Sequence, residues 1–152
     1  MMEKLTRALF TATSKVGTKE LTGNNDGPFV DECVKVTGLD NQAYIKGDGK
    51  GKGYSWCAAF ISWVFKTSGV DMKPNAWAPA LFPANKLVKD GKYRPMDVFG
   101  ITYNKIQNGH VGFVLYYPEE GDSFISLEGN WGGQVCVNNR KKAEINSVSR
   151  WI

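Results

Sequence analysis

The spacing of apolar residues changes once along this chain of 152 residues, and that change limits the folds open to it. As far as Gly69, apolar residues recur at the three- and four-residue spacing of helices. From Met96 onward, segments rich in Val, Ile, Phe and Tyr alternate with turn residues, which is typical of strands. This order predicts an α+β domain with N-terminal helices packed on one face of a mostly antiparallel sheet of about five strands.

Three segments of the first half predict helices. We expect them over residues 3–16, from Pro28 to the residue before Gly38, and over residues 56–68. Asn25 or Asp26 is the expected N-cap of the second helix, and Ser55 that of the third. The third helix is apolar on nearly all sides, so it should be buried.

The strands are expected at residues 96–102, 111–117, 123–128, 134–138 and 145–151. Glycine alternates with charge in the segment 46–53, KGDGKGKG, which predicts a loop. Three prolines between residues 71 and 92 predict an irregular connection with short helical turns at most. Because no linker or repeat interrupts this order, we expect residues 1–152 to form a single domain.

Composition excludes several classes of protein. The net charge of +4 is modest and scattered, and the dense basic run 140–142 is expected to be a solvated turn, so no nucleic-acid partner is predicted. No run approaches the roughly 20 apolar residues of a membrane span. The N-terminus lacks a secretory pattern, and three cysteines are too few and too odd in number for a disulfide framework. We expect a monomer that is made in the cytoplasm.

Cys57 stands near the start of the third expected helix, in the segment GYSWCAAFISWVF. A free cysteine is usually a buried apolar residue, and that interpretation stays open here. In the first turn of a helix, however, unpaired N–H groups and the helix dipole favour the thiolate, which is the nucleophilic form. Cys57 is therefore a candidate nucleophile.

His110 is the one histidine in the chain, in the segment NGHVGFVLYY. It follows the turn-forming pair Asn108-Gly109, so we expect it at the start of a strand, near a sheet edge or a cleft. A cysteine enzyme needs a general base within hydrogen-bond reach of its thiol. In this sequence only His110 can supply an imidazole.

Hairpin geometry predicts what faces this histidine. If the turn is centred near Glu120, the numbers of facing residues sum to about 240, which brings His110 opposite the segment 128–131. Glu128 and Asn130 should then share one face of their strand. A carboxylate or amide beside an imidazole fixes its tautomer and orientation. The alternative is that Glu128 is a strand-end charge and Asn130 a turn residue.

The order Cys57, His110, Glu128-Gly129-Asn130, with the phrases WCAAFISWVF, GHVGFVL and LEGNWGG, resembles the CHAP family of cysteine, histidine-dependent amidohydrolases and peptidases, within the papain-like superfamily. The N-terminal segment VGTKELTGNNDGPFVDECVKVTG is also similar to the lead-in helices of phage lysins and wall hydrolases. The resemblance spans nearly the whole chain. It implies a papain-like fold and cleavage of amide bonds in bacterial peptidoglycan.

By this resemblance, Cys57 attacks the scissile carbonyl and forms a thioester. His110 takes the thiol proton and later protonates the leaving amine, Glu128 orients His110, and Asn130 supports the site or the oxyanion. The backbone N–H of Cys57 is a natural oxyanion donor on physical grounds alone. The bond cut is that of an N-acetylmuramoyl-L-alanine amidase or of a stem-peptide or cross-bridge endopeptidase.

Two departures from the family pattern concern a turn and a metal. Family members often have Gly-Asp at the start of the first long strand, whereas this chain has Met96-Asp97, so a different turn is expected there. Some members bind calcium through acidic residues ahead of the cysteine, but here Asp48 stands among lysines and glycines. One carboxylate among cations is a poor calcium site, so we expect no metal and no cofactor.

Two tryptophans flank the candidate residues. Trp56 precedes Cys57 and Trp131 follows Asn130, so both are candidate substrate-binding residues, with burial in the core as the alternative. Trp63 is assigned to the core.

The resemblance leaves the biological setting open. A chain without an export signal or a wall-binding domain fits a phage lysin released by a holin, or an antibacterial effector injected into the periplasm and blocked by a cognate immunity protein. Two rival functions are a cysteine deamidase or acyltransferase that acts on a protein, and a non-catalytic wall-binding module. A pure binder would not require Cys57, His110 and Glu128.

Overall fold

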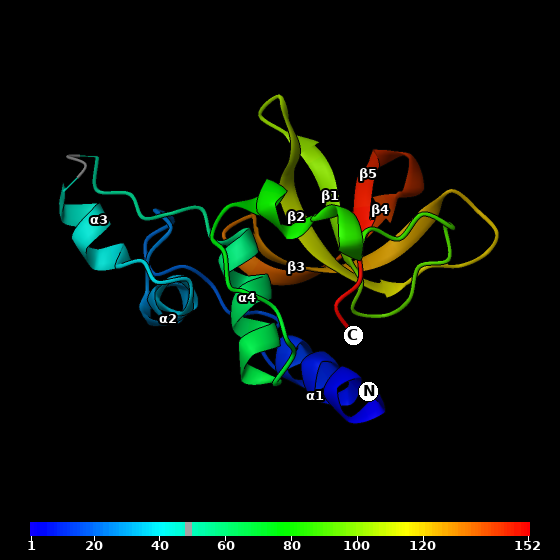
Figure 1. Cartoon of the computed structure of the whole chain (residues 1–152). Coiled ribbons are helices and arrows are strands. Elements are labelled where there is room, and N and C mark those ends of the chain that lie inside the picture. The colour runs from blue at the N-terminus through cyan, green and yellow to red at the C-terminus, as the bar shows by residue number, and fades with distance from the viewer. Residues whose placement is uncertain (48–49) are drawn as a thin grey trace.

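The computed structural model describes residues 1–47 and 50–152 of the chain (Figure 1). Within these residues the helices come first: α1 (Met2–Thr13), α2 (Pro28–Val36), α3 (Asn41–Gly47) and α4 (Cys57–Thr67). The proline-rich connection contains two short 3-10 turns, η1 (Ala78–Leu81) and η2 (Ala84–Lys86). The strands follow: β1 (Val98–Tyr103), β2 (Ile106–Tyr116), β3 (Ser123–Trp131), β4 (Gln134–Lys141) and, after the turn η3 (Lys142–Glu144), β5 (Ile145–Ser149).

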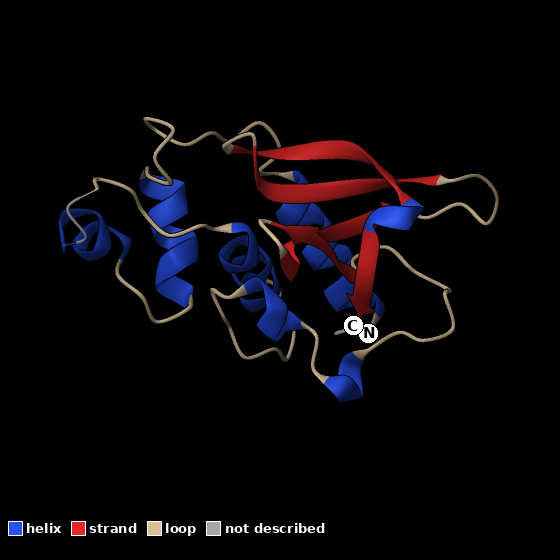
Figure 2. Ribbon diagram, turned by 90° about the horizontal axis from the view of Figure 1, so that it is seen from above, coloured by secondary structure: helices blue, strands red, loops and turns tan. Residues whose placement is uncertain are grey.

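The strands form one antiparallel sheet in the order β4-β3-β2-β1-β5. The view from above shows it as a strongly twisted layer (Figure 2). Helix α4 packs on this sheet against β2 and β3, and it also contacts α1 and α2. The predicted fold class, with helices on one face of an antiparallel sheet, is therefore confirmed.

Helix α4 is the centre of the core, and its residues from Cys57 to Phe65 are all buried. Its C-terminal end is closed as the sequence predicted, because Gly69 takes a left-handed φ of 72°. The N–H of Val70 donates to the Phe65 carbonyl (2.9 Å) and that of Gly69 to the Lys66 carbonyl (3.2 Å), which is the Schellman arrangement. Burial and capping hold the helix rigidly, so its first residue has a fixed position.

The predicted N-caps are wrong for both α2 and α4. The N-cap of α2 is Gly27, with a φ of 112°. The carboxylate of Asp26 instead accepts a hydrogen bond from the Thr22 backbone N–H (2.8 Å). The N-cap of α4 is Trp56, whose side chain makes no capping bond, and the Ser55 hydroxyl is engaged elsewhere. The first N–H groups of α4 are therefore left without a side-chain cap.

Helix α3 was not predicted, and it takes in the first two residues of the expected loop 46–53. The buried side chain of Asn41 anchors it by long-range bonds: its amide donates to Asp31 Oδ1 (2.7 Å) and to the Asn25 carbonyl (2.9 Å), and its Oδ1 accepts from the Tyr54 N–H (2.8 Å). These contacts outweigh the weak helical propensity of the local sequence.

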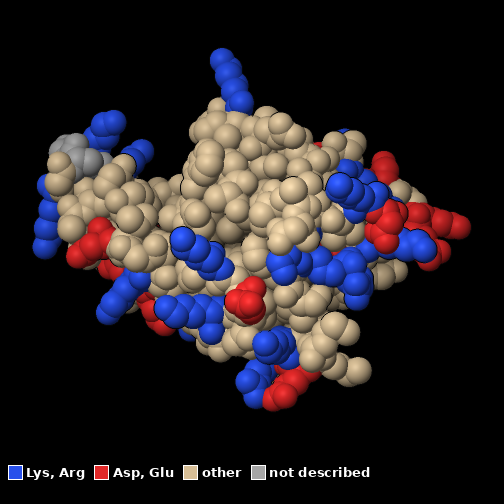
Figure 3. All heavy atoms as spheres, viewed as in Figure 1, with Lys and Arg blue, Asp and Glu red and all other residues tan. Residues whose placement is uncertain are grey.

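No helix in the described ranges is long and apolar enough to cross a membrane. Lys and Arg are spread over the face of the molecule seen in Figure 3 without forming a continuous band.

Candidate functional site

Cys57 is the first residue of α4, and its side chain reaches a cleft although the residue is only 4% exposed. In the first turn of a helix the backbone N–H groups lack intrahelical acceptors, and the helix dipole is positive. The position of Cys57 in the first turn is as predicted from the sequence. The predicted reason, an N-cap by Ser55, is wrong, and the burial of α4 fixes the position of the thiol.

His110 lies within β2, five residues after the true hairpin turn. That turn is Asn104-Lys105, where both residues take left-handed φ values of 49° and 64°. The predicted turn pair Asn108-Gly109 lies inside β2, at an irregularity in its pairing with β1. Asn108 has a φ of 56° there, so the pair marks a bulge and not a hairpin turn. Bulges of this kind re-aim side chains, and His110 is the next residue.

The predicted register of β2 against β3 is confirmed. Phe113 pairs with Leu127 and Val114 with Ser126, so the facing residue numbers sum to 240. His110 Nε2 consequently lies 2.7 Å from Glu128 Oε1, and the two side chains are 4% and 0% exposed. Because Nε2 is committed to Glu128, Nδ1 is the nitrogen left to face Cys57, with which the imidazole is hydrogen-bonded.

The Glu128 carboxylate is surrounded by donors. Arg140, from β4, binds it with two nitrogens: Nη2 at 2.7 Å from Oε1 and Nε at 3.0 Å from Oε2. The Ser126 hydroxyl also donates to Oε2 (2.5 Å). With these partners the buried carboxylate stays ionised, because bidentate pairing to a guanidinium offsets the cost of burial.

These contacts shift the pKa values of the three groups in a consistent pattern. Burial tends to raise the pKa of Cys57, but the hydrogen bond and charge of His110 outweigh it, and the pKa of the thiol is lowered. Burial tends to lower the pKa of His110, but its bonds to Cys57 and Glu128 raise it to about 9. Against burial, His110, Arg140 and Ser126 lower the pKa of Glu128 to about 2. The arrangement favours a thiolate beside an imidazolium at neutral pH.

Asn130 ends the same strand in a left-handed conformation, with a φ of 61°. Its amide donates to the Ser55 Oγ (3.2 Å), which ties the end of β3 to the segment before α4. Asn130 also lines the cleft with Cys57 and His110. The structure therefore brings it to the site, where it contacts Ser55.

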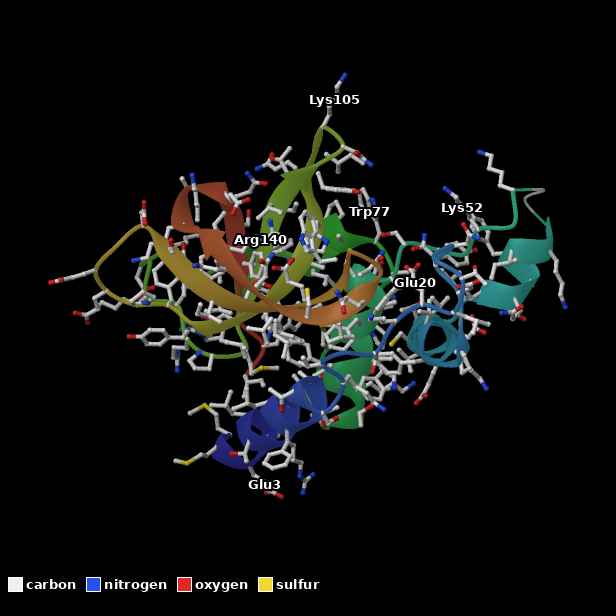
Figure 4. All side chains as sticks on the ribbon, turned by 180° about the vertical axis from the view of Figure 1, so that it is seen from behind. Glu3, Glu20, Lys52, Trp77, Lys105 and Arg140 are labelled. Carbon is white, nitrogen blue, oxygen red and sulfur yellow. The ribbon has the colours of Figure 1, made fainter. Side chains whose placement is uncertain are left out.

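The cleft has two arms that meet at Cys57. One arm, of about 700 Å³, is polar, and its lining includes Glu20, Asn25, Lys52, His110, Asn130 and Trp131. The other, of about 240 Å³, is lined by Trp77, Pro79, Ile106 and neighbouring residues. Ser55, Cys57 and Tyr103 line both. Figure 4 labels Glu20 and Lys52 of the first arm and Trp77 of the second. A chain-like substrate could therefore pass over the thiol.

The structure separates the tryptophans that the sequence placed at the cleft. Trp56 is 0% exposed, so the prediction that it binds substrate is wrong: its ring packs on Phe29 in the core and its Nε1 donates to Glu20 Oε1 (2.9 Å). Trp131 lines the cleft, 5.0 Å from the His110 ring, and the Arg140 guanidinium lies 4.0 Å above it. Trp63 is buried, as expected.

The expected change of turn at Met96 takes a specific form. Met96 is buried and adopts a φ of 69°, a left-handed conformation that glycine adopts without strain. Asp97 beside it is buried and paired with Arg150. Asp48, the calcium ligand considered above, lies outside the described residues. In the described part of the chain, no three His, Cys, Asp or Glu side chains are grouped so that they could hold a metal ion.

The comparison with protein families decides what kind of domain this is. The model of the CHAP domain matches residues 49–130, more than half of the chain. The chain belongs to the CHAP family. The matched range contains Cys57, His110, Glu128 and Asn130, whereas Glu20 and Arg140 lie outside it. No curated protein matches the sequence.

Several solved structures share the fold of this CHAP domain. RipD from Mycobacterium tuberculosis, described as a non-catalytic NlpC/p60 domain protein adapted to peptidoglycan binding, is 15% identical with a TM-score of 0.58, and each chain is covered completely. The P60 domain of the M. avium paratuberculosis antigen MAP1272c is 13% identical with a TM-score of 0.58, over 99% of this chain and 95% of that one. The NlpC/p60 domain of the peptidoglycan hydrolase SagA is 13% identical with a TM-score of 0.52, over 96% and 97%. At these identities the likeness shows the fold alone.

Sequence reasoning missed two charged residues of the CHAP domain's cleft and its surroundings. Arg140 was assigned to a solvated turn, yet it is 5% exposed and pairs with Glu128. The register of β3 and β4 could have predicted this contact. Cys136 lies opposite Glu128 and Arg140 lies opposite Phe124, so Glu128 and Arg140 have their side chains on the same face of the sheet. No local sequence pattern marks Glu20 as a cleft residue, because its segment reaches the cleft only through tertiary contacts.

Proposed function

We propose that this CHAP domain is a cysteine hydrolase that cleaves amide bonds in bacterial peptidoglycan. The observation that carries the proposal is the arrangement of Cys57, His110 and Glu128, in which a thiol of lowered pKa at a helix N-terminus is hydrogen-bonded to an imidazole held by a buried carboxylate. A wall-binding module has no need of such an arrangement.

Acylation begins when the Cys57 thiolate attacks the scissile carbonyl carbon. A C–S bond forms, and the carbonyl π electrons move to the oxygen. When the tetrahedral intermediate collapses, the C–N bond breaks and Nδ1 of the His110 imidazolium gives its proton to the leaving nitrogen. The products of this half-reaction are a free amine and a thioester on Cys57.

Deacylation uses the same groups in reverse. Neutral His110 accepts a proton from a water molecule as its oxygen attacks the thioester carbon. The C–S bond then breaks, which releases the carboxylic acid and restores the thiolate beside the imidazolium. Glu128 stays ionised throughout and holds the imidazole by Nε2, because its lowered pKa of about 2 prevents it from taking a proton at neutral pH.

The developing oxyanion lies near the start of α4 in this mechanism. The backbone N–H of Cys57, which has no intrahelical acceptor at that position, is our proposed donor. Asn130 supports the site by its bond to Ser55, which lies two residues before Cys57.

The lining of the cleft supports a peptide joined to a sugar as the substrate. The exposed ring of Tyr103 lies 6.2 Å from Trp131, and Trp131 lies 5.0 Å from His110, so aromatic faces border the reacting groups. Aromatic side chains provide apolar contact area together with polar edges, which suits the faces of sugars and acyl groups. Trp131 thereby remains a proposed substrate-binding residue.

The test is digestion of purified peptidoglycan by the wild type and by Cys57→Ala, with mass analysis of the soluble fragments. We expect new amine and carboxyl termini with the wild type alone, and their identity assigns the amidase or the endopeptidase reaction. Equal fragment profiles for the two proteins would exclude the hydrolase. If both proteins sediment with intact wall and neither releases fragments, the result would favour a non-catalytic binding module, as RipD is described among the structures of this fold.

For the biological setting we propose action at the cell wall after delivery as a phage lysin or an injected effector. Expression in a Gram-negative host separates cytoplasmic from wall-directed toxicity. Lysis that requires both an added export signal and Cys57 would support the proposal, whereas toxicity of the cytoplasmic form would favour a deamidase or acyltransferase acting on a protein.

A further inference from the structure

Glu20 is a charged group of the cleft that the reaction steps above do not use. It lies between α1 and α2, on a segment that runs antiparallel to the start of β4, where Lys19 bridges Gln134. The Glu20 N–H donates to the Gly133 carbonyl (2.9 Å), and the Thr18 carbonyl accepts from Val135 (2.9 Å). These bonds hold the carboxylate in place beside the β3–β4 turn.

One oxygen of this carboxylate is occupied and the other is available. Oε1 accepts the Trp56 Nε1–H at 2.9 Å, and Trp56 immediately precedes Cys57, so Glu20 has a set position relative to the thiol. Among the described residues, Oε2 has no hydrogen bond, and no Lys, Arg or His forms an ion pair with Glu20. Oε2 faces Gly133, where an added Cβ would approach it to 3.3 Å. Because Gly133 has no side chain, this oxygen stays uncovered.

We propose that Glu20 binds a primary ammonium group of the substrate in the polar arm of the cleft. This inference rests on the proposed function and specifies its substrate class. A half-buried carboxylate with one neutral donor can gain a charge-assisted hydrogen bond, and a cleft strengthens such a bond relative to open water. Lys52, which is exposed, lines the same arm and suits a substrate carboxylate rather than an ammonium.

Two groups of a peptidoglycan stem can provide the ammonium. The side-chain amine of its diamino acid is an ammonium while free and becomes a neutral amide when the stem is cross-linked. The N-terminal amine is free only after the stem has left the glycan. Because the proposed substrate is a peptide still joined to a sugar, its N-terminus is not a free amine, and we assign Glu20 to the side-chain ammonium. The enzyme then selects stems that are not cross-linked, as an amidase or a stem-peptide endopeptidase and not as a cross-bridge endopeptidase.

The experiment compares Glu20→Gln with a matched control, Glu32→Gln. Gln at position 20 keeps an acceptor for Trp56 but removes the charge. Glu32 accepts the Trp63 Nε1–H at 3.0 Å in the same manner, but it does not line the cleft. The substrates are a muropeptide with its free side-chain amine, the same muropeptide acetylated at that amine, and the glycan-free stem peptide with a free or acetylated N-terminus.

With the wild type, side-chain acetylation should lower kcat/KM about tenfold to a hundredfold, mainly through KM, as expected for loss of a bond to a charged group. Glu20→Gln should lose this preference, so that it cleaves the free and the acetylated muropeptide with similar kcat/KM. Glu32→Gln should keep the wild-type preference. A preference that follows N-terminal acetylation would overturn the assignment to the side chain.

The inference and the proposed function can fail separately. Equal cleavage of free and acetylated muropeptides by the wild type, or an unchanged preference in Glu20→Gln, would overturn the inference while leaving the hydrolase intact. If the wild type cleaves none of the substrates, the role of Glu20 is tested by binding: the affinity of Cys57→Ala is measured for the free and for the acetylated muropeptide. Tighter binding of the free amine that disappears with Glu20→Gln would support Glu20 alone, and equal binding would overturn it.

Discussion

His110 Nε2 and Glu128 Oε1 lie 2.7 Å apart in a part of the sheet where the two side chains are 4% and 0% exposed. The same carboxylate binds Arg140 through both its oxygens. The histidine is therefore held by a carboxylate that is itself fixed by Arg140 and by the Ser126 hydroxyl.

Replacement of Glu128 by Gln should lower both activity and stability. The variant keeps the shape of the side chain but removes the buried charge that pairs with Arg140, whose remaining carboxylate partner is the partly exposed Glu144 at 3.3 Å. Breaking a buried pair costs about 3–5 kcal/mol, and Glu144 should keep the loss at the lower end of that range. Because the imidazolium also loses its partner, kcat should fall by about 10²-fold or more. Thermal unfolding and muropeptide turnover measure the two effects. A fully active Glu128→Gln enzyme would show that the carboxylate does not hold the histidine.

Arg140→Lys should cost activity as well as stability, because a lysine cannot bind the carboxylate with two nitrogens or stack on Trp131 as a planar group. Arg150→Lys is the matched control, since Arg150 binds Asp97 with two nitrogens (2.7 and 2.8 Å) outside the cleft. Each variant should lose about 1–3 kcal/mol of stability. Only Arg140→Lys should lower kcat, and equal kcat losses in the two would reduce Arg140 to a purely structural role.

Gly129→Ala should be destabilising, because a Cβ there would lie 2.6 Å from Phe60 of α4. Gly129 is the point where β3 approaches the helix that bears Cys57, next in sequence to Glu128. Overpacking of this kind costs about 1–3 kcal/mol. Gly47→Ala is the control, since a Cβ at Gly47 meets nothing within 4 Å. Comparable melting temperatures for the two variants would contradict the close approach.

The pH dependence of kcat/KM should be bell-shaped. Activity requires the thiolate and the imidazolium together, so it rises as the pH passes the lowered pKa of Cys57. It falls as the pH passes the raised pKa of His110, about 9. A falling limb near pH 6.5, the ordinary value for histidine, would contradict the coupling between the two groups.

Much of this site could be predicted from the sequence because two of its determinants are local. The apolar run before Gly69 predicts α4 and places Cys57 in its first turn. The length of the β2–β3 hairpin predicts that His110 lies opposite the segment that contains Glu128. The same reasoning misjudged Asn108-Gly109, since the pair favours left-handed backbone in a bulge as readily as in a turn.

The remaining features depend on contacts between distant segments. Trp56 points into the core because its ring packs on Phe29 and its Nε1–H is bonded to Glu20. No local sequence pattern distinguishes this orientation from that of a ring exposed at the cleft. Helix α3 exists because Asn41 bonds to Asp31 and to the Tyr54 backbone. Such long-range bonds override propensity, and they become visible only in the structure.

Alkylation of the thiols tests the central claim, a Cys57 thiolate stabilised by His110, most directly. Iodoacetamide at pH 5.5, followed by peptide mass analysis, should modify Cys57 well before Cys33 and Cys136, whose pKa values are raised by burial. In His110→Ala, modification of Cys57 at this pH should slow by about tenfold or more. Equal rates at Cys57 in the wild type and in His110→Ala, or no preference for Cys57 over Cys136, would contradict the claim.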